Sequence, residues 1–303
     1  MKQNIFIETA KGRLIRPIVF VLPLGLLLFI VGQLLGIGIV TIFVKILSLL
    51  GLASQTTAIT ALAFLNYDFG VFLVFFVWVK WVERRPISSM GLFKNRAGVE
   101  LLKGWLLGGA MFTLIIFLLG LFGIVQIDKI NLTVSSLGFL ILFILAWQVQ
   151  SAGEELMTRG WLLPVLASHH HRITAVSIVS VLFAAMHLLN PNVTLISFAN
   201  ATLFGLMMCL YLIWKGNLWG AFGIHAAWNC FQGSIFGVQV SGLDVLPSAI
   251  IKLKLAGPDF LTGGKFGIEG SLVTLVIYAS VCFFLYLKIR KKVAVRPQIS
   301  SKS

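Results

Sequence analysis

The sequence is poor in charged residues. Only 11% of its 303 residues are Asp, Glu, Lys or Arg, whereas 58% are hydrophobic, and the mean hydropathy is +0.99. A soluble domain carries roughly 25% charged residues. The composition therefore excludes an ordinary soluble protein and predicts a polytopic membrane protein with little room for a soluble domain.

Acidic residues are scarcer still, with 10 Asp and Glu against 24 Lys and Arg, for a net charge of +14. Such an excess of positive charge is also found in nucleic-acid-binding proteins. Here the basic residues lie in short loops and tails between apolar runs, as the positive-inside rule expects. We therefore expect the lipid bilayer, and no nucleic acid, to be the partner of these charges.

Cysteine is rare, and the metal motifs that depend on fixed spacing are absent from the sequence. Cys209, Cys230 and Cys282 all lie in apolar stretches, without a CxxC pair. This pattern excludes a disulfide framework and is typical of buried thiols that act as small apolar residues. The sequence also lacks HExxH and any internal repeat.

Long apolar runs fill the rest of the chain and predict an all-α membrane helix bundle of about eight transmembrane helices. The expected spans are residues 18–44, 57–82, 104–124, 137–164, 173–189, 194–214, 218–240 and 271–287. With eight spans, most lysines and arginines fall on the same side as both termini. The N- and C-termini are therefore predicted to be cytoplasmic.

Two glutamates and an arginine interrupt the fourth apolar run, in the segment SAGEELMTRGWLLP. Charged groups inside a membrane are costly and mark functional sites by default. Glu155 and Arg159 are four residues apart with the acid first, the favourable order for a helical ion pair. Glu154 points elsewhere on the helix and is left without a charge partner from its own segment.

Hairpin symmetry indicates which groups meet Glu154. Measured from the turn at 169–172, His187 lies as deep in the fifth span as Glu154 does in the fourth, to within about 5 Å. Phe183 lies one turn before His187, and His225 and Asn229 share one face of the seventh span. The sequence predicts that these polar groups surround one buried cavity.

Each of these residues also has a structural interpretation. An intramembrane histidine or asparagine can simply form hydrogen bonds between helices, and Glu155–Arg159 can be a structural ion pair. His169, His170 and His171 resemble a metal-binding tract but belong to a turn that is expected to be solvated. The carboxylate, two histidines and an amide at helical spacings are together better explained as a catalytic site.

Three motifs in order resemble a known family. EELMTR (Glu154–Arg159) fits EExxxR, FAAMH fits FxxxH, and HAAWN fits HxxxN. In a multi-span protein, this order is similar to that of the CPBP family of intramembrane proteases, also called Abi, which includes CAAX prenyl endopeptidases. The resemblance covers roughly residues 135–290, and it extends more loosely to RRPISSMGL and TGGKFGIEG.

The resemblance implies an endopeptidase that hydrolyses a peptide bond near a membrane. Glu154 and His187 would activate a water, His225 and Asn229 would stabilise the oxyanion, and Glu155 with Arg159 would hold Glu154 in place. It also implies a protein or peptide substrate, lipidated or membrane-anchored forms included, and a site that opens toward the cytoplasm. The expected organisation is three N-terminal spans (1–134), a catalytic core (135–290) and a basic tail (291–303).

Three alternatives stay open. In a zinc-dependent version of the same protease, Glu154, His187 and His225 would bind the metal. We favour no metal and no other cofactor, because HExxH is absent and only Glu155 could support the histidines as a second carboxylate, with Arg159 competing for it. The second alternative is a non-proteolytic scaffold or immunity protein. The third is a transporter, which usually shows internal repeats.

Overall fold

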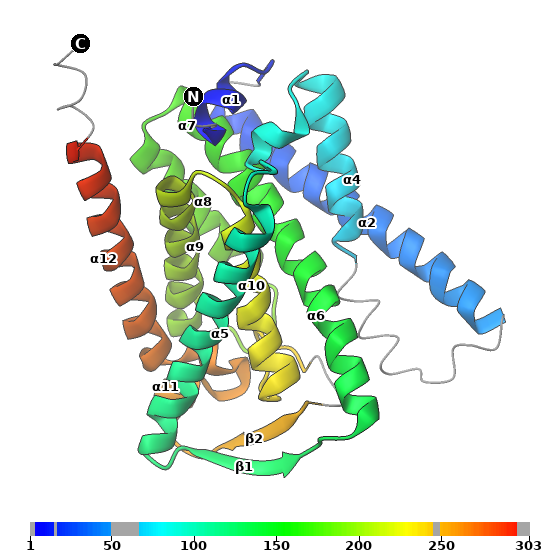
Figure 1. The fold of residues 1–303 in the computed structure, drawn as a ribbon, viewed down its shortest axis with the longest axis vertical. Coiled ribbons are helices and arrows are strands. Elements are labelled where there is room, and N and C mark those ends of the chain that lie inside the picture. The colour runs from blue at the N-terminus through cyan, green and yellow to red at the C-terminus, as the bar shows by residue number, and fades with distance from the viewer. Residues whose placement is uncertain (1–3, 15–16, 50–66, 245–248, 296–303) are drawn as a thin grey trace.

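The structure is a computed structural model, and it describes residues 4–14, 17–49, 67–244 and 249–295. In this part of the chain the fold is a bundle of helices with one two-stranded sheet (Figure 1). The predicted all-α polytopic helix bundle is therefore confirmed. The first ten residues of the predicted second span, 57–66, lie outside the described residues.

The helices follow the apolar runs of the sequence. The α-helices are α1 (Ile5–Ala10), α2 (Ile18–Leu49), α4 (Phe69–Val77), α5 (Ala97–Leu121), α6 (Val134–Glu155), α7 (Leu163–His169), α8 (Arg172–Met186), α9 (Leu195–Lys215), α10 (Trp219–Asn229), α11 (Asp259–Thr262) and α12 (Leu272–Val295). The π-helices are η1 (Trp78–Val82), η3 (Leu156–Leu162) and η4 (Cys230–Ile235), and the 3-10 helices are η2 (Ile87–Met90), η5 (Gly264–Phe266) and η6 (Ile268–Gly270).

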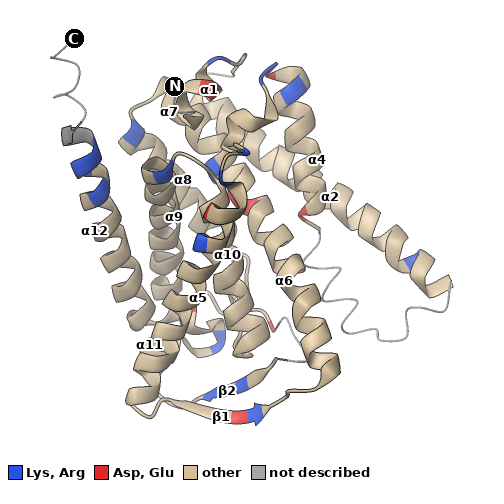
Figure 2. Cartoon of the chain, in the orientation of Figure 1, with Lys and Arg blue, Asp and Glu red and all other residues tan. Residues whose placement is uncertain are grey.

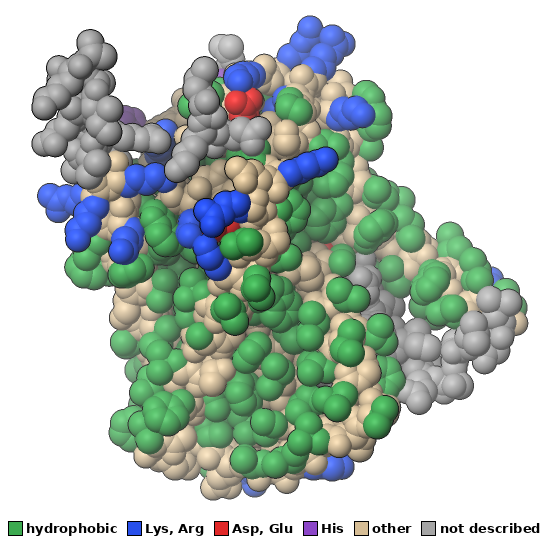
Figure 3. Space-filling model, viewed as in Figure 1, with side chains coloured by type: hydrophobic (Ala, Val, Ile, Leu, Met, Phe, Trp, Pro, Cys, Tyr) green, Lys and Arg blue, Asp and Glu red, His purple; other side chains and the backbone are tan. Residues whose placement is uncertain are grey.

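Five helical segments among the described residues are long and apolar enough to cross a membrane. They are Ile18–Leu49, Ala97–Leu121, Val134–His169, Leu195–Lys215 and Leu272–Lys292. Phe69–Val82 and Arg172–Met186 are apolar but shorter. The count of eight spans therefore stays a prediction. Large apolar side chains cover the middle of the visible outer surface, as expected of a surface in contact with lipid (Figure 3).

The two ends of the bundle differ in charge. The N-terminal helix α1, α7 and the C-terminal end of α12 lie at one end, where most of the lysines and arginines gather (Figure 2). At the opposite end, β1 (Val125–Ile130) pairs antiparallel with β2 (Ile251–Leu255). The charge distribution agrees with termini that share the cytoplasmic side.

The acidic segment lies in the longest continuous helical segment described, Val134–His169, which consists of α6, η3 and α7 and is called the rod below. Thr133 begins α6 with a capping box, in which its side chain accepts from the backbone N–H of Ser136 and the Ser136 hydroxyl accepts from the backbone N–H of Thr133. The rod continues through η3 into α7, where Pro164 has no N–H to donate. Wider π-turns of this kind are frequent at functional sites, and η3 begins directly after Glu155.

Glycines bring α5 and α10 into backbone contact. A Cβ atom built on Gly104 would lie 2.2 Å from the carbonyl oxygen of Gly220, and one built on Gly108 would lie 2.3 Å from that of Ile224. Small residues of this kind allow close approach between membrane helices. They fix the position of α10, which carries His225 and Asn229.

We expect Gly108→Val to destabilise the protein by about 1–3 kcal/mol, because the new side chain would overpack the contact and push α10 away. Thermal unfolding of the detergent-solubilised protein measures the effect. Gly120→Val is the matched control on the same helix, since a Cβ at Gly120 meets nothing within 4 Å. Equal midpoints for the two variants would contradict the packing role of Gly108.

A buried ion pair ties the N-terminal part to the rod. Glu83 accepts from the Nε of Arg85 at 2.6 Å and from the indole N–H of Trp161, within η3, at 2.7 Å. Arg85 also donates to the hydroxyl of Ser89 at 2.6 Å. The RRPISSMGL stretch, which contains Arg85 and Ser89, is thus connected through Glu83 to the π-helical segment η3.

Candidate active site

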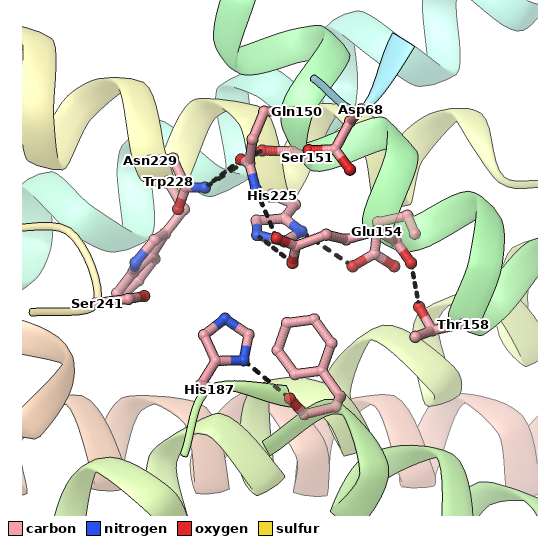
Figure 4. A network of polar contacts seen from close by, with 12 residues as sticks. Asp68, Gln150, Ser151, Glu154, Thr158, His187, His225, Trp228, Asn229 and Ser241 are labelled. Atoms are coloured by element: carbon pink, nitrogen blue, oxygen red, sulfur yellow. Dashed lines mark hydrogen bonds and ion pairs between the residues drawn. The ribbon is translucent and has the colours of Figure 1, made fainter. Parts of the chain in front are cut away.

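A cavity of about 270 Å³ lies inside the bundle. Its walls come from α2, α6, α8, α9, α10, α12, η5 and η6, and from the segments that precede α4 and follow α8 and η4. The predicted residues Glu154, His187, His225, Asn229 and Phe183 all line it. The structure brings these side chains to one cavity from three helices, α6, α8 and α10 (Figure 4).

Glu154 lies at the C-terminal end of α6 and points into the cavity (Figure 4). Its Oε1 accepts a hydrogen bond from the Nε2 of Gln150 at 2.6 Å, while its buried Oε2 has no hydrogen-bond partner among the described residues. Glu154 has no charged partner on its own helix, as predicted. Its neutral partner on that helix is Gln150. A carboxylate oxygen in this state is available to accept a proton from a bound molecule.

His225 lies between the two glutamates. Its Nδ1 is 3.0 Å from Oε1 of Glu155, and its Nε2 is 4.0 Å from Oε2 of Glu154. Because a carboxylate oxygen accepts, Nδ1 carries a proton and donates to Glu155. Glu155 was expected to hold Glu154, which stays a prediction, and the structure shows in addition that Glu155 contacts His225.

Glu155 and Arg159 form the ion pair that their spacing predicts, at 3.0 Å and with both side chains fully buried. Arg159 also donates to the hydroxyl of Thr158 and the carbonyl of Gly205, and its guanidinium lies 4.3 Å from the ring centroid of Phe183. The same carboxylate oxygen of Glu155 serves Arg159 and His225. The pair therefore connects α6, α8, α9 and α10 at the base of the site.

His187 directly follows α8 and is its C-cap residue. Its Nδ1 lies 2.8 Å from the carbonyl oxygen of Phe183, and the two rings are 4.9 Å apart. A carbonyl oxygen can only accept, so Nδ1 carries the proton and Nε2 is left with a lone pair. His187 lies on the opposite side of the cavity from Glu154 and His225 (Figure 4).

Asn229 lies one turn after His225 on α10. Its Nδ2 is 3.1 Å from Oε1 of Gln150 and 3.3 Å from the hydroxyl of Ser151. Gln150 therefore bridges Glu154 and Asn229 through the two ends of its amide (Figure 4). Sequence reasoning missed Gln150, although its position one turn before Glu154 was a signal that it shares that face.

Asp68 and Gln33 bring the N-terminal part of the chain into the site. Both line the cavity, and the amide of Gln33 donates to Asp68 at 3.1 Å. A Cβ built on Gly153 would lie 2.6 Å from the Cβ of Asp68, so this glycine allows α4 to approach α6 next to Glu154. No feature of the sequence linked residues 1–80 to the acidic segment, and this contact could not have been predicted from spacing.

Glu269 organises the loops at the end of the cavity. Its carboxylate accepts from the indole of Trp228, the amide of Gln232, and the backbone and hydroxyl of Ser241. These loops lie at the end of the bundle opposite α1 and α7 (Figure 1). The expected opening toward the cytoplasm therefore stays a prediction.

His169, His170 and His171 lie at the end of α7 and in the turn before α8, and none of them lines the cavity. The three cysteines are buried and unpaired with one another, as predicted. Among the residues that the structure describes, no group of three His, Cys, Asp or Glu side chains is arranged to hold a metal ion. Glu154, His187 and His225 are not such a group as they stand.

Comparison with known families identifies the region that contains these residues. Residues 135–231, about a third of the chain, match the family described as Rce1-like, type II CAAX prenyl endopeptidase Rce1-like. The match covers all three motifs and confirms the resemblance to the CPBP family. No curated protein matches the chain. No solved structure matches it either.

Proposed function

We propose that this integral membrane protein is an intramembrane endopeptidase, of the CAAX type or related to it, that hydrolyses peptide bonds with a glutamate-activated water. The observation that carries the proposal is the convergence of Glu154, His187, His225 and Asn229 on one cavity inside an apolar bundle. The family match over 135–231 supports the same reaction class.

The first step requires a base and an orienting group on either side of a water. The free Oε2 of Glu154 takes a proton from the water, and the lone pair on Nε2 of His187 accepts its second hydrogen bond. The water oxygen then attacks the peptide carbonyl. Glu154 afterwards returns the proton to the departing amine, which completes the hydrolysis.

The negative charge on the carbonyl oxygen needs donors. His225 already donates from Nδ1 to Glu155, so the doubly protonated ring is the form that can also donate from Nε2. Asn229 supplies an N–H once one of its contacts, with Gln150 or Ser151, is released. A single oxyanion donor typically contributes about 2.7–4 kcal/mol of transition-state stabilisation.

The zinc-dependent version uses Glu154, His187 and His225 as ligands, and Glu155 would act as the supporting carboxylate on His225. The described side chains are not grouped as a metal site, so we assign no step to zinc. The non-proteolytic scaffold is a further alternative, and activity measurements separate it from the protease.

The test is peptidase activity of the purified, detergent-solubilised protein on a mixed peptide library that includes C-terminally lipidated peptides. Glu154→Ala serves as the background, and each assay is run with and without a strong chelator. We expect cleavage that survives chelation and disappears in the variant. Cleavage lost to chelator and restored by Zn²⁺ would support the zinc version, and no cleavage above background in a folded sample would support the scaffold.

Gln150→Leu is expected to lower kcat about 10–100-fold with a smaller change in KM, because both Glu154 and Asn229 lose the amide that positions them. Gln148→Leu is the matched control on the same helix, since Gln148 binds the indole of Trp105 and does not line the cavity. Steady-state kinetics of the two variants on one peptide measure the difference. Equal kcat values for the two variants would show that Gln150 does not position Glu154 and Asn229 for the reaction.

A further inference from the structure

The last helix of the bundle, α12, turns one narrow face toward the interior. The buried residues on this face, including the one directly before the helix, are Ser271, Thr274, Tyr278, Cys282 and Leu285. They recur every three or four residues, which places them on one side of the helix. The side chains described elsewhere on α12 are exposed or half-exposed. Any role of α12 in the cavity therefore belongs to this face.

Two contacts hold this face against α9, on which α12 packs (Figure 1). The amide of Asn200, on α9, donates to the carbonyl of Ser271 at 2.8 Å. One turn after Tyr278, the thiol of Cys282 donates to the carbonyl of Leu203 at 3.6 Å. Tyr278 lies between these two attachments, so its side chain has a defined position.

The ring of Tyr278 forms part of the cavity wall. Its centroid lies 5.5 Å from that of Phe204 on α9 and 4.9 Å from that of Trp228 on α10. The ring of Phe204 is in turn 5.0 Å from that of His225. Tyr278 is therefore separated from a proposed catalytic side chain by a single aromatic ring.

The hydroxyl of Tyr278 is not used by the fold. It has no hydrogen-bond partner among the residues that the structure describes, and its oxygen is not fully enclosed by them. Because the whole residue is only 2% exposed and lines the cavity, that oxygen faces the cavity. Hydroxyls inside proteins are normally paired with a protein group, a ligand or ordered water.

The polar atoms of the proposed catalytic residues need different partners. Oε2 of Glu154 and Nε2 of His187 are acceptors, whereas Nδ1 of His225 and Nδ2 of Asn229 already donate within the protein. A peptide brings both N–H donors and carbonyl acceptors. The hydroxyl of Tyr278 offers a carbonyl a donor that no other described group has to release.

We propose that Tyr278 is a substrate-binding residue whose hydroxyl donates a hydrogen bond to a backbone carbonyl of the peptide in the cavity. The inference rests on the proposed function and adds a residue of α12, outside the matched region 135–231. The carbonyl that Tyr278 binds is not the one attacked, because the ring of Phe204 stands between Tyr278 and His225. A bond made equally in the bound substrate and the transition state changes KM and leaves kcat unchanged.

The first experiment is steady-state hydrolysis of one mapped peptide by Tyr278→Phe. This substitution removes only the hydroxyl and keeps the ring contacts with Phe204 and Trp228. We expect KM to rise about three- to thirtyfold, with kcat unchanged. A fall in kcat alone, or no change in either constant, would overturn the inference while leaving the proposed protease intact.

A structural role of the hydroxyl has a different signature. Because the hydroxyl has no partner among the described residues, Tyr278→Phe should keep the midpoint of thermal unfolding, and a lowered midpoint would contradict the inference. Tyr286→Phe is the matched control on the same helix, since Tyr286 is 52% exposed. This control should leave KM, kcat and the midpoint unchanged.

Binding without turnover separates this inference from the proposed reaction. Calorimetry compares the affinity of the same peptide for Glu154→Gln and for the double variant Glu154→Gln with Tyr278→Phe. A series of peptides in which one carbonyl at a time is replaced by a thioamide, a weaker acceptor, locates the bond. We expect one thioamide to weaken binding only where the Tyr278 hydroxyl is present. Equal affinities of the two variants for every peptide would refute the inference.

Discussion

Glu154→Gln is expected to lower kcat for peptide hydrolysis by a factor between about a hundred and ten thousand, the range that a general base contributes. The amide matches the carboxylate in size and can keep a hydrogen bond to Gln150, but it cannot take a proton from water. The amide Nε2 of the glutamine would also face the cavity as a donor, in place of the unpartnered acceptor Oε2. The measurement is single-turnover hydrolysis of a quenched fluorescent peptide.

The control is Glu8→Gln, which removes a carboxylate from the surface pair with Lys11 and should leave kcat unchanged. Thermal unfolding of both variants checks that the fold is retained. A Glu154→Gln protein that hydrolyses the peptide at the original rate would eliminate Glu154 as the general base.

Arg159→Met is expected to destabilise the protein by about 3–5 kcal/mol, because it leaves Glu155 charged and buried without its partner. The variant also loses hydrogen bonds to Thr158 and to the carbonyl of Gly205 on α9, and the contact with the ring of Phe183. Methionine retains much of the apolar volume, so the loss reports on charge more than on packing. The measurement is the midpoint of thermal or denaturant unfolding in detergent.

The double variant Glu155→Gln with Arg159→Met should recover part of that stability, because no uncompensated charge remains. Lys11→Met, which breaks an exposed pair with Glu8, is the control and should cost about 0–1 kcal/mol. A double variant less stable than Arg159→Met alone would show that hydrogen bonds, and not the unpaired charge, dominate at this position.

Hydropathy and spacing predicted the helices well because each apolar run is a local property of the chain. The Glu155–Arg159 pair and the shared face of His225 and Asn229 also follow from helical geometry alone. That Glu154 and His187 line the same cavity was predicted from the short turn between their helices. These predictions needed only the distance along one helix or across one hairpin.

Contacts between distant helices were beyond this reasoning. Asp68 and Gln33 reach the cavity because glycines bring α2, α4 and α6 close together, and nothing in their local sequence indicates which helix they face. Gln150 was missed for a different reason, since the acidic pair next to it carried the stronger signal. The contact between Glu155 and His225 was not predicted, because His225 comes from a helix about seventy positions later in the chain.

The π-helical segment η3 affects how related sequences should be aligned. Each π-turn closes its hydrogen bond over five residues where an α-turn uses four, so a segment of this kind holds one residue more than the α-helix it replaces. A relative with one residue fewer after Arg159 can therefore keep the acidic pair and α7 in the same places. A one-residue gap between Gly160 and Leu162 in such an alignment would mark a change of helix type, with Glu154 and Glu155 before it retained.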